Sequence, residues 1–228
     1  INKNNLRLGS SSLRLFCIMK KQEGDCMQFV TADTHFFHSD LLGIDDFAPR
    51  PFPNVQVMNQ TIIDSWNAKV GTDDIVYHLG DIALYFTKPA KKSYEAVFEV
   101  LNSLNGHLVL IKGNHDSRAL FNYLASHNYE FGGLPKFRFH DVGVLSKYDH
   151  RQYYLTHYPM MLGIAPQIIN LHGHIHHYAV PAKENINVGV DSPELAYLTN
   201  KPAFGEPLNF AEIEQMVERK AVDFAKRK

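Results

Sequence analysis

The sequence is poor in cysteine and contains no long hydrophobic run. Cys17 and Cys26 are the two cysteines among 228 residues, too few for a disulfide framework or a cysteine-ligated zinc site. No stretch reaches the roughly 18 apolar residues of a membrane-spanning helix. Residues 13–19 lack the small-residue cleavage pattern of an export signal. We therefore expect a cytoplasmic protein with reduced thiols and without a membrane segment.

The chain also lacks an excess of charge of either sign. Lys and Arg number 23 and Asp and Glu number 24, which leaves a net charge of -1. A field this weak does not draw a protein to nucleic acid or to an anionic membrane, so we expect no strong non-specific binding of nucleic acid. Any phosphate group that the protein handles must be held locally.

The length of the chain and its ordinary composition indicate one folded domain. Hydrophobic residues make up 45% and charged residues 21%, which argues against extensive disorder. Residues 1–26 lack a steady periodicity and contain Gly9-Ser-Ser-Ser12. We interpret them as a peripheral N-terminal extension, part of which could derive from cloning. Residues 27–228 are predicted to form a single domain.

The first half of the chain alternates short apolar runs with amphipathic stretches, an order that favours a parallel sheet with helical crossovers. Strands are expected at 28–32, 75–79 and 108–112, and helices at 55–70 and 89–105. Asn54 can cap the first of these helices.

The second half changes character after a short predicted helix at 118–126. It contains short runs separated by turn residues, which are expected to pair in an antiparallel or mixed manner. These runs are 136–139, 143–145, 152–156, 167–171 and 186–190. A capping box at Asn209 and Glu212 opens a last helix. The whole pattern predicts an α/β fold with two packed mixed β-sheets flanked by helices, an α/β/β/α sandwich.

Five groups of polar residues stand where apolar runs stop, the edge at which open α/β sheets bind their ligands. They are Asp33-Thr-His35, Gly80-Asp81, Gly113-Asn-His-Asp116, Thr156-His157 and His172-Gly-His-Ile-His176. Histidine, which numbers 13 in the chain, is the commonest metal ligand. The groups offer oxygen and imidazole ligands but no thiolate, a set that suits manganese, iron or zinc.

Each group taken alone has a simpler interpretation. Asp33-Thr-His35 could be a turn that caps a helix, and alternate histidines also occur on solvated strands. Their joint occurrence at the ends of apolar runs favours one functional site. Two other classes stay open, a non-catalytic scaffold and a metal-dependent hydrolase of C–N or C–O bonds in carbonyl compounds. A scaffold would be expected to have lost ligand residues, and such a hydrolase would more usually carry paired histidines after its first strand.

The order of the five groups resembles the signature of the calcineurin-like metallophosphoesterases, which is Asp-x-His, Gly-Asp, Gly-Asn-His-Asp or Glu, a lone His, and Gly-His-x-His. The resemblance implies two divalent metal ions (manganese, iron, zinc or nickel) at the strand ends. The implied ligands are Asp33, His35 and His176 for one ion, Asn114, His157 and His174 for the other, and Asp81 as a bridge. His115 would lie beside the substrate, and Asp116 would orient the His115 ring.

The resemblance further implies a phosphoesterase in which a hydroxide that bridges two metal ions attacks the phosphorus. Two such cations lower the pKa of a shared water toward about 7. His115 would assist departure of the leaving group as a general acid. A phosphodiester or nucleotide-type substrate is favoured, because aromatic residues near the motifs could stack a nucleobase. These are Phe36, Phe37, Tyr85, Phe86 and Tyr158, for which a position in the core is the alternative. A phosphomonoesterase acting on proteins or small molecules is the alternative.

Three further residues are candidates for substrate binding. His38 follows the first motif closely, and the guanidinium groups of Arg50 and Arg118 match the geometry of a phosphate. Surface positions without a role are the alternative for both arginines. His78 alternates away from Asp81 on its strand and could equally be a core histidine.

Overall fold

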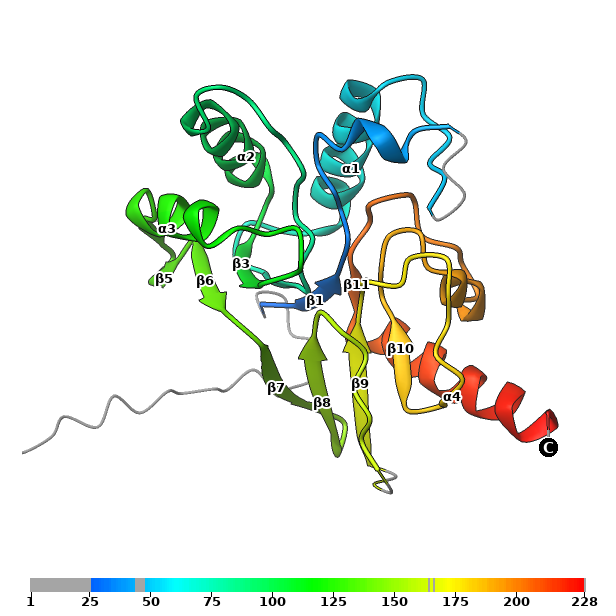
Figure 1. Ribbon diagram of the computed structural model, residues 1–228. Coiled ribbons are helices and arrows are strands. Elements are labelled where there is room, and N and C mark those ends of the chain that lie inside the picture. Colours follow the sequence, from blue (N-terminus) through cyan, green and yellow to red (C-terminus); the bar gives the residue numbers. More distant parts are fainter. Residues whose placement is uncertain (1–25, 44–47, 164, 166, 228) are drawn as a thin grey trace, which may run out of the picture.

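The computed structural model describes residues 26–43, 48–163, 165 and 167–227 (Figure 1). The predicted N-terminal extension lies outside these residues except for Cys26. No helix within the described ranges is long and apolar enough to cross a membrane.

The first half of the chain builds a five-stranded sheet in the order β11-β1-β2-β3-β6. Every pair is parallel except β1 with β11 at one edge. The strands are β1 (Gln28–Thr31), β2 (Ile75–His78), β3 (His107–Ile111), β6 (Phe137–His140) and β11 (Leu208–Asn209). The helices that follow the first three strands are α1 (Val55–Lys69), α2 (Lys91–Ser103) and α3 (Arg118–Ser126). The parallel pairs β1–β2 and β2–β3 confirm the predicted arrangement of the strands. Figure 1 shows the three helices above the sheet.

One strand from the second half of the chain joins the first sheet. Antiparallel or mixed pairing is predicted for 136–139, but β6 pairs in parallel with β3, with Leu108 opposite Phe137. Helix α3 and the small hairpin of β4 (Glu130–Phe131) and β5 (Leu134–Pro135) lie between these two strands in the chain. This connection is long enough to return the chain to the start of the sheet, which a parallel pair requires.

The second sheet has four strands in the order β10-β9-β8-β7. Strands β7 (Gly143–Tyr148) and β8 (Arg151–Thr156) form an antiparallel hairpin, whereas β9 (Ile168–His172) and β10 (Asn185–Asn187) continue in parallel. The chain then passes through the short helix η2 (Pro193–Tyr197) to α4 (Phe210–Lys226), and another short helix, η1 (Ser39–Leu41), follows β1. The capping box predicted at Asn209 and Glu212 is present at the start of α4.

Strand β3 is buried on both faces, which explains its continuous apolar run. Leu108 and Leu110 pack against α1, α2 and α3, whereas Val109 and Ile111 lie in the cluster between the two sheets. Neighbouring side chains of a strand point to opposite faces, so a strand covered on both sides needs apolar residues at every position.

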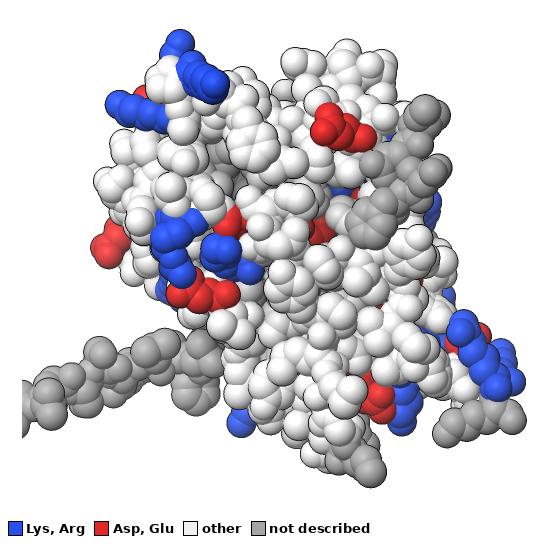
Figure 2. Space-filling model, viewed as in Figure 1, with Lys and Arg blue, Asp and Glu red and all other residues white. Residues whose placement is uncertain are grey.

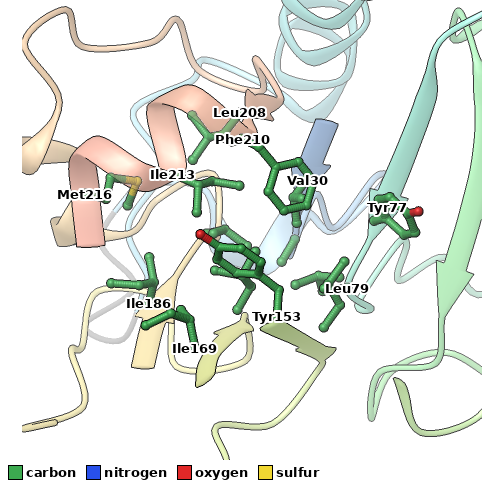
Figure 3. Packing of buried hydrophobic residues seen from close by; sticks show 14 of the residues in the cluster. Val30, Tyr77, Leu79, Tyr153, Ile169, Ile186, Leu208, Phe210, Ile213 and Met216 are labelled. Carbon is green, nitrogen blue, oxygen red and sulfur yellow. The ribbon is translucent and has the colours of Figure 1, made fainter. Parts of the chain in front are cut away.

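The cluster between the sheets fixes their relative position. Val30 of the first sheet and Leu79, directly after β2, lie near Tyr153 of the second sheet, and Met216 of α4 packs beside Ile186 (Figure 3). All five side chains are buried, and full burial of one large apolar side chain contributes about 1.5–3 kcal/mol. Two packed mixed sheets flanked by helices, as predicted, are therefore confirmed.

The register of the parallel strands brings the polar groups to one edge. Thr31 lies opposite His78, and His78 lies opposite Leu110, so β1, β2 and β3 end at similar heights. An isolated parallel bridge between Ala32 and Gly189 joins the end of β1 to the segment after β10. The loops after β1, β2 and β3 thus begin at a common edge, and the segment after β10 of the second sheet reaches the same edge.

A buried lysine binds the chain just before β3, at the end of the strand that lies away from the polar groups. Its burial leads us to predict a pH dependence of stability. The Lys136 ammonium group donates hydrogen bonds to the carbonyl oxygens of Leu104 and Gly106, just before β3 begins. Burial lowers the pKa of Lys136 from 10.5 to about 8. The unfolded chain binds more protons than the folded chain between these values, so the free energy of unfolding should gain a rising contribution as pH increases from about 8 to 10.5.

Denaturant titrations of the wild type and of Lys136→Met at several pH values in this range test that prediction. The variant should lack the rising contribution, so the difference in free energy of unfolding between the two proteins should change with pH. Parallel pH profiles for the two proteins would show that the ammonium group keeps its proton.

Candidate metal centre

The first of two ligand groups combines loops from the two sheets. Asp33 and His35 follow β1, and His176 follows β9. One ligand atom from each of the three residues lies within 4.8 Å of the others, and all three residues are buried. A carboxylate and two imidazoles at this spacing can surround a divalent cation.

The second ligand group lies beside the first. Asp81, His157 and His174 also present ligand atoms within 4.8 Å of one another. The Asn114 side-chain oxygen lies 2.8 Å from His157 Nε2 and 2.8 Å from His174 Nδ1, which adds an amide oxygen to this group. Four donors from the ends of β2, β3, β8 and β9 thus meet at one point.

Asp81, a member of the second group, also borders the first. Its Oδ2 is 3.6 Å from His35 Nε2 in the first group and 3.4 Å from His157 Nε2 in the second. A carboxylate has two oxygens and can contact two ions, so the position of Asp81 fits the bridging role that the motif implies. The structure brings together all seven residues predicted as metal ligands.

One nitrogen atom of the first group, His35 Nε2, tests whether a metal ion fits this site. His35 Nε2 is buried and has no hydrogen-bond partner among the described residues, although it faces Asp81. A buried polar atom without a partner costs free energy, and a cation at this point would remove that cost. The donors therefore fit a metal ion in chemistry as well as in spacing.

The loops that carry the ligands adopt an uncommon backbone conformation. Six residues at or beside the two groups have positive φ angles between 45° and 72°, and they are Asp33, His35, Phe37, Asp81, His174 and His176. The left-handed region costs roughly 1–2 kcal/mol for a residue with a side chain. Such outliers cluster at functional sites, where the surrounding structure holds them.

Burial dominates the acid–base properties of the first group. It raises the pKa of Asp33 well above its usual range, and the nearby carboxylates of Asp191 and Asp81 raise it further. Burial also lowers the pKa of His35 and of His157, which favours the neutral imidazoles that bind metals. A bound cation would favour the ionised form of Asp33, since its charge opposes both effects on the carboxylate.

His115 is exposed next to both groups. Its ring centre lies 5.2 Å from that of His35 and 6.0 Å from that of His38. Its backbone N–H donates a hydrogen bond of 2.9 Å to Asp81 Oδ1, which fixes the main chain and leaves the ring facing solvent. An imidazole in this position can reach a substrate at the metal centre without being a ligand.

The predicted contact between Asp116 and the His115 ring is wrong. The Asp116 carboxylate accepts backbone N–H groups of Asp81, Ile82 and Gly113 at 2.8–3.0 Å, and no hydrogen bond joins it to the His115 ring within the described part of the chain. Burial raises the pKa of Asp116 to about 6. Asp116 therefore holds the loop after β2 against the loop after β3, and it supports Asp81 rather than His115.

The three candidates for substrate binding have different surroundings. His38 is half-buried, and its Nδ1 lies 3.0 Å from His35 Nδ1. Arg118 is exposed, and its guanidinium forms an ion pair of 2.6 Å with Asp141. Arg50 is fully buried, so both its predicted surface position and its predicted contact with substrate are wrong. Its donors are used by Asp191 and by backbone carbonyls.

Asp191 is the residue of this region that the sequence analysis missed. Its Oδ2 accepts hydrogen bonds from Arg50 and from His176 Nδ1, and its side chain is 3% exposed. A signal was available, because Asp191 directly follows an apolar run at Val188-Gly-Val190, as the five polar groups follow theirs. The charge of Arg50 and the His176 hydrogen bond lower the pKa of Asp191 to about 2, against the opposing effect of burial.

Other histidines near the motifs are structural in this arrangement. His78 is buried in the core, 2.9 Å from Thr34 Oγ1, and burial lowers its pKa to about 3. His172 is also buried, and burial lowers its pKa to about 4. His107 is also buried and stacks on Phe131.

Four of the five aromatic residues predicted near the motifs are at least partly exposed, and the fifth lies in the core. The Tyr158 ring is half-exposed and lies edge-on to His174, with ring centres 4.6 Å apart. Phe37 and Tyr85 stack at 4.6 Å, and the neighbouring Phe86 is 85% exposed. Phe36, in contrast, is fully buried and cannot stack on a substrate.

Comparisons with known proteins agree with this arrangement. The sequence model of the family described as calcineurin-like phosphoesterase matches residues 29–212. A protein of Methanocaldococcus jannaschii, described as uncharacterized protein MJ1445, is 35% identical over 171 residues, which are 72% of this chain and 81% of that protein. The crystal structure of a protein of unknown function, AQ665 from Aquifex aeolicus, is similar with a TM-score of 0.56 and 19% identity. It covers 84% of this chain and 100% of that chain, and at this identity it shows the fold alone.

Proposed function

The chain belongs to the calcineurin-like phosphoesterases, and from this premise we propose that it is a metal-dependent hydrolase that cleaves phosphodiester or nucleotide-type substrates. The observation that carries the proposal is the pair of neighbouring ligand groups, of which Asp81 belongs to the second and contacts the first. A non-catalytic scaffold would not need to keep both groups complete.

The ligand groups would hold two divalent ions, with Asp33, His35 and His176 on one, Asn114, His157 and His174 on the other, and Asp81 between them. Ions in these positions would supply a hydroxide nucleophile at neutral pH and neutralise charge on the phosphate. Oxygen and nitrogen donors accept manganese, iron, zinc or nickel, and the supply of each metal in the cell often decides among them.

His115 is the residue that we propose as the general acid. Its ring is exposed beside the ligand groups, and its main chain is fixed by the bond to Asp81. An alkoxide leaves phosphorus slowly unless it receives a proton, and a positioned imidazolium can supply that proton. His38, which lies near both His35 and His115, is in reach of the same substrate.

Aromatic side chains support a substrate with a planar group. Tyr158 borders the second ligand group, and its exposed ring offers a face on which a nucleobase could stack. Phe86 and the stacked pair of Phe37 and Tyr85 add aromatic surface after β1 and β2. The second candidate, a phosphomonoesterase, uses the same ligand groups and would be independent of these rings.

The distribution of charge supports a small substrate over a long nucleic acid. On the face shown in Figure 2, the described Lys and Arg side chains lie in small groups, several of them with Asp or Glu nearby. Arg118 illustrates this, because Asp141 neutralises it at 2.6 Å. Phosphate contacts of long nucleic acids need uncompensated Lys and Arg side chains.

Metal reconstitution tests the proposed function. Protein stripped of metal should hydrolyse neither bis-p-nitrophenyl phosphate nor p-nitrophenyl phosphate, and addition of manganese, nickel, zinc or iron singly should restore turnover, because the nucleophile depends on the ions. The ratio of diester to monoester turnover distinguishes the two candidate substrate classes. Binding of two ions per chain without turnover of either ester would favour the scaffold, and release of amine from an amide substrate would favour the carbonyl hydrolase.

A further inference from the structure

Arg50 and Asp191 form a buried ion pair that lies behind the first ligand group. Arg50 Nε and Nη2 donate to Asp191 Oδ2 at 3.1 and 2.8 Å, and the two side chains are 0% and 3% exposed. The residues are 141 positions apart in the chain. Burial of such a pair costs desolvation free energy, so the ion pair alone does not explain why these two residues are buried. The further hydrogen bonds of the two side chains are therefore the informative contacts.

The remaining donors of Arg50 hold the loop after β1. Nη1 donates to the Thr34 carbonyl oxygen at 2.8 Å, and Nη2 donates to the Asp33 carbonyl oxygen at 2.6 Å. Asp33 and His35 on either side of Thr34 have the left-handed conformation, with φ angles of 57° and 48°. Arg50 therefore provides partners for carbonyl groups that this strained loop buries.

Asp191 extends the same contact to the second sheet. Its Oδ2 accepts a hydrogen bond of 2.9 Å from His176 Nδ1, so the proton of a neutral His176 ring resides on Nδ1. The lone pair of that ring is then on Nε2, and His176 offers one ligand atom to the group that it forms with Asp33 and His35. A carboxylate that fixes the tautomer and direction of a ligating imidazole is an effective means of tuning metal affinity.

The other ligand group is held by different contacts. His157 Nδ1 donates to the Leu79 carbonyl oxygen, and Asp81 Oδ1 accepts from the His115 backbone. Asn114 joins His157 and His174 directly. Within the described ranges, no hydrogen bond links Asp81, His157 or the His174 ring to Arg50 or Asp191.

We propose that Arg50 and Asp191 are positioning residues that assemble one of the two metal sites, the site of Asp33, His35 and His176. The inference rests on the proposed function in that both concern the same metal centre. It goes further because it assigns the pair to one site only. Loss of the pair should therefore lower the metal affinity of this site and leave the affinity of the site of Asn114, His157 and His174 unchanged.

The test is a metal titration of metal-free Asp191→Asn, which keeps the volume of the side chain but removes its charge. Manganese binding followed by calorimetry should show two ions per wild-type chain. In the variant, the affinity of one site should fall roughly 10–100-fold, the effect of losing a partner of a metal-bound histidine. Arg50→Lys should produce the same selective loss, because a lysine cannot reach Asp191 and both carbonyl groups at once.

Lys136→Met is the matched control, because it removes another buried cation that donates to two backbone carbonyl groups but lies away from both ligand groups. It should keep both affinities even if it unfolds at a lower temperature. Retention of two wild-type affinities in Asp191→Asn, or an equal loss at both sites, would overturn the inference. If both test variants fail to fold, nitrogen-15 spectra of the metal-free wild type decide, since a neutral His176 ring protonated on Nε2 contradicts the proposed contact.

These outcomes distinguish the inference from the proposed function. A wild type that binds two ions but hydrolyses no phosphate ester would contradict the function and leave the selective loss measurable. A wild type that hydrolyses esters while Asp191→Asn keeps both ions would contradict the inference alone. A wild type that binds no metal would contradict both.

Discussion

Replacement of His115 by alanine should lower the rate of hydrolysis of an alkyl phosphodiester by about 10²–10⁴-fold, the usual contribution of a general acid. The variant should keep its metal ions, because the bond that connects this residue to Asp81 comes from the backbone N–H and survives the substitution. The exposed ring makes no hydrogen bond within the described residues that its loss would break. The effect should therefore fall on the chemical step and not on assembly of the site.

The leaving group provides the internal comparison for His115. A p-nitrophenolate leaves without a proton, so His115→Ala should lose much less activity on bis-p-nitrophenyl phosphate than on an alkyl diester. Metal content of each preparation should be measured alongside the rates. His127→Ala, which removes another exposed histidine at the end of α3, serves as the control and should retain both activities. Equal losses on aryl and alkyl esters would rule out proton donation by His115.

Replacement of Gly113 by alanine should abolish metal binding at the centre and with it the hydrolysis of every ester. A Cβ atom at this position would lie 2.2 Å from Asp81 Oδ1 and 2.3 Å from Asp81 N, far inside van der Waals contact. Asp81 cannot keep its place between the two ligand groups under such an overlap. Forcing extra atoms into a packed site also destabilises a protein, by about 1–3 kcal/mol.

Gly71→Ala provides the matched control for Gly113→Ala. Its added Cβ would meet only the Asp74 side chain, at 3.2 Å, in an exposed turn. We expect wild-type metal content and a change in the free energy of unfolding within about 0.5 kcal/mol. Metal analysis, ester hydrolysis and denaturant unfolding of the two variants check both expectations. A Gly113→Ala protein with full metal content and activity would show that Asp81 does not occupy the position proposed for it.

Much of the fold could be predicted because its signals are local. Strand β3 is apolar at every position from Leu108 to Ile111 since both of its faces are covered, and the capping box of α4 is a contact between residues three positions apart. The partner with which a strand pairs is not determined locally. The short run of β6 carries no mark of the sheet that it joins, because its pairing with β3 depends on where α3 returns the chain.

The five polar groups could also be found from the sequence, since each of them follows an apolar run and parallel strands place such ends at one edge. The seven ligands within those groups were implied by the resemblance to the phosphoesterase signature. The wrong predictions concern side chains whose partners lie far away in the chain. Asp116 binds the backbone after β2, and Arg50 is buried against a carboxylate 141 positions later.

The sequence by itself therefore determined which residues stand at the strand ends and which chemistry they can perform, because strand period and ligand type are properties of short segments. The tertiary structure alone decided which loops pack together next to those residues and which distant side chains bind them. Arg50, Asp191 and Asp116 acquire their roles from that packing, since a buried charge must find partners wherever the fold brings donors and acceptors within reach.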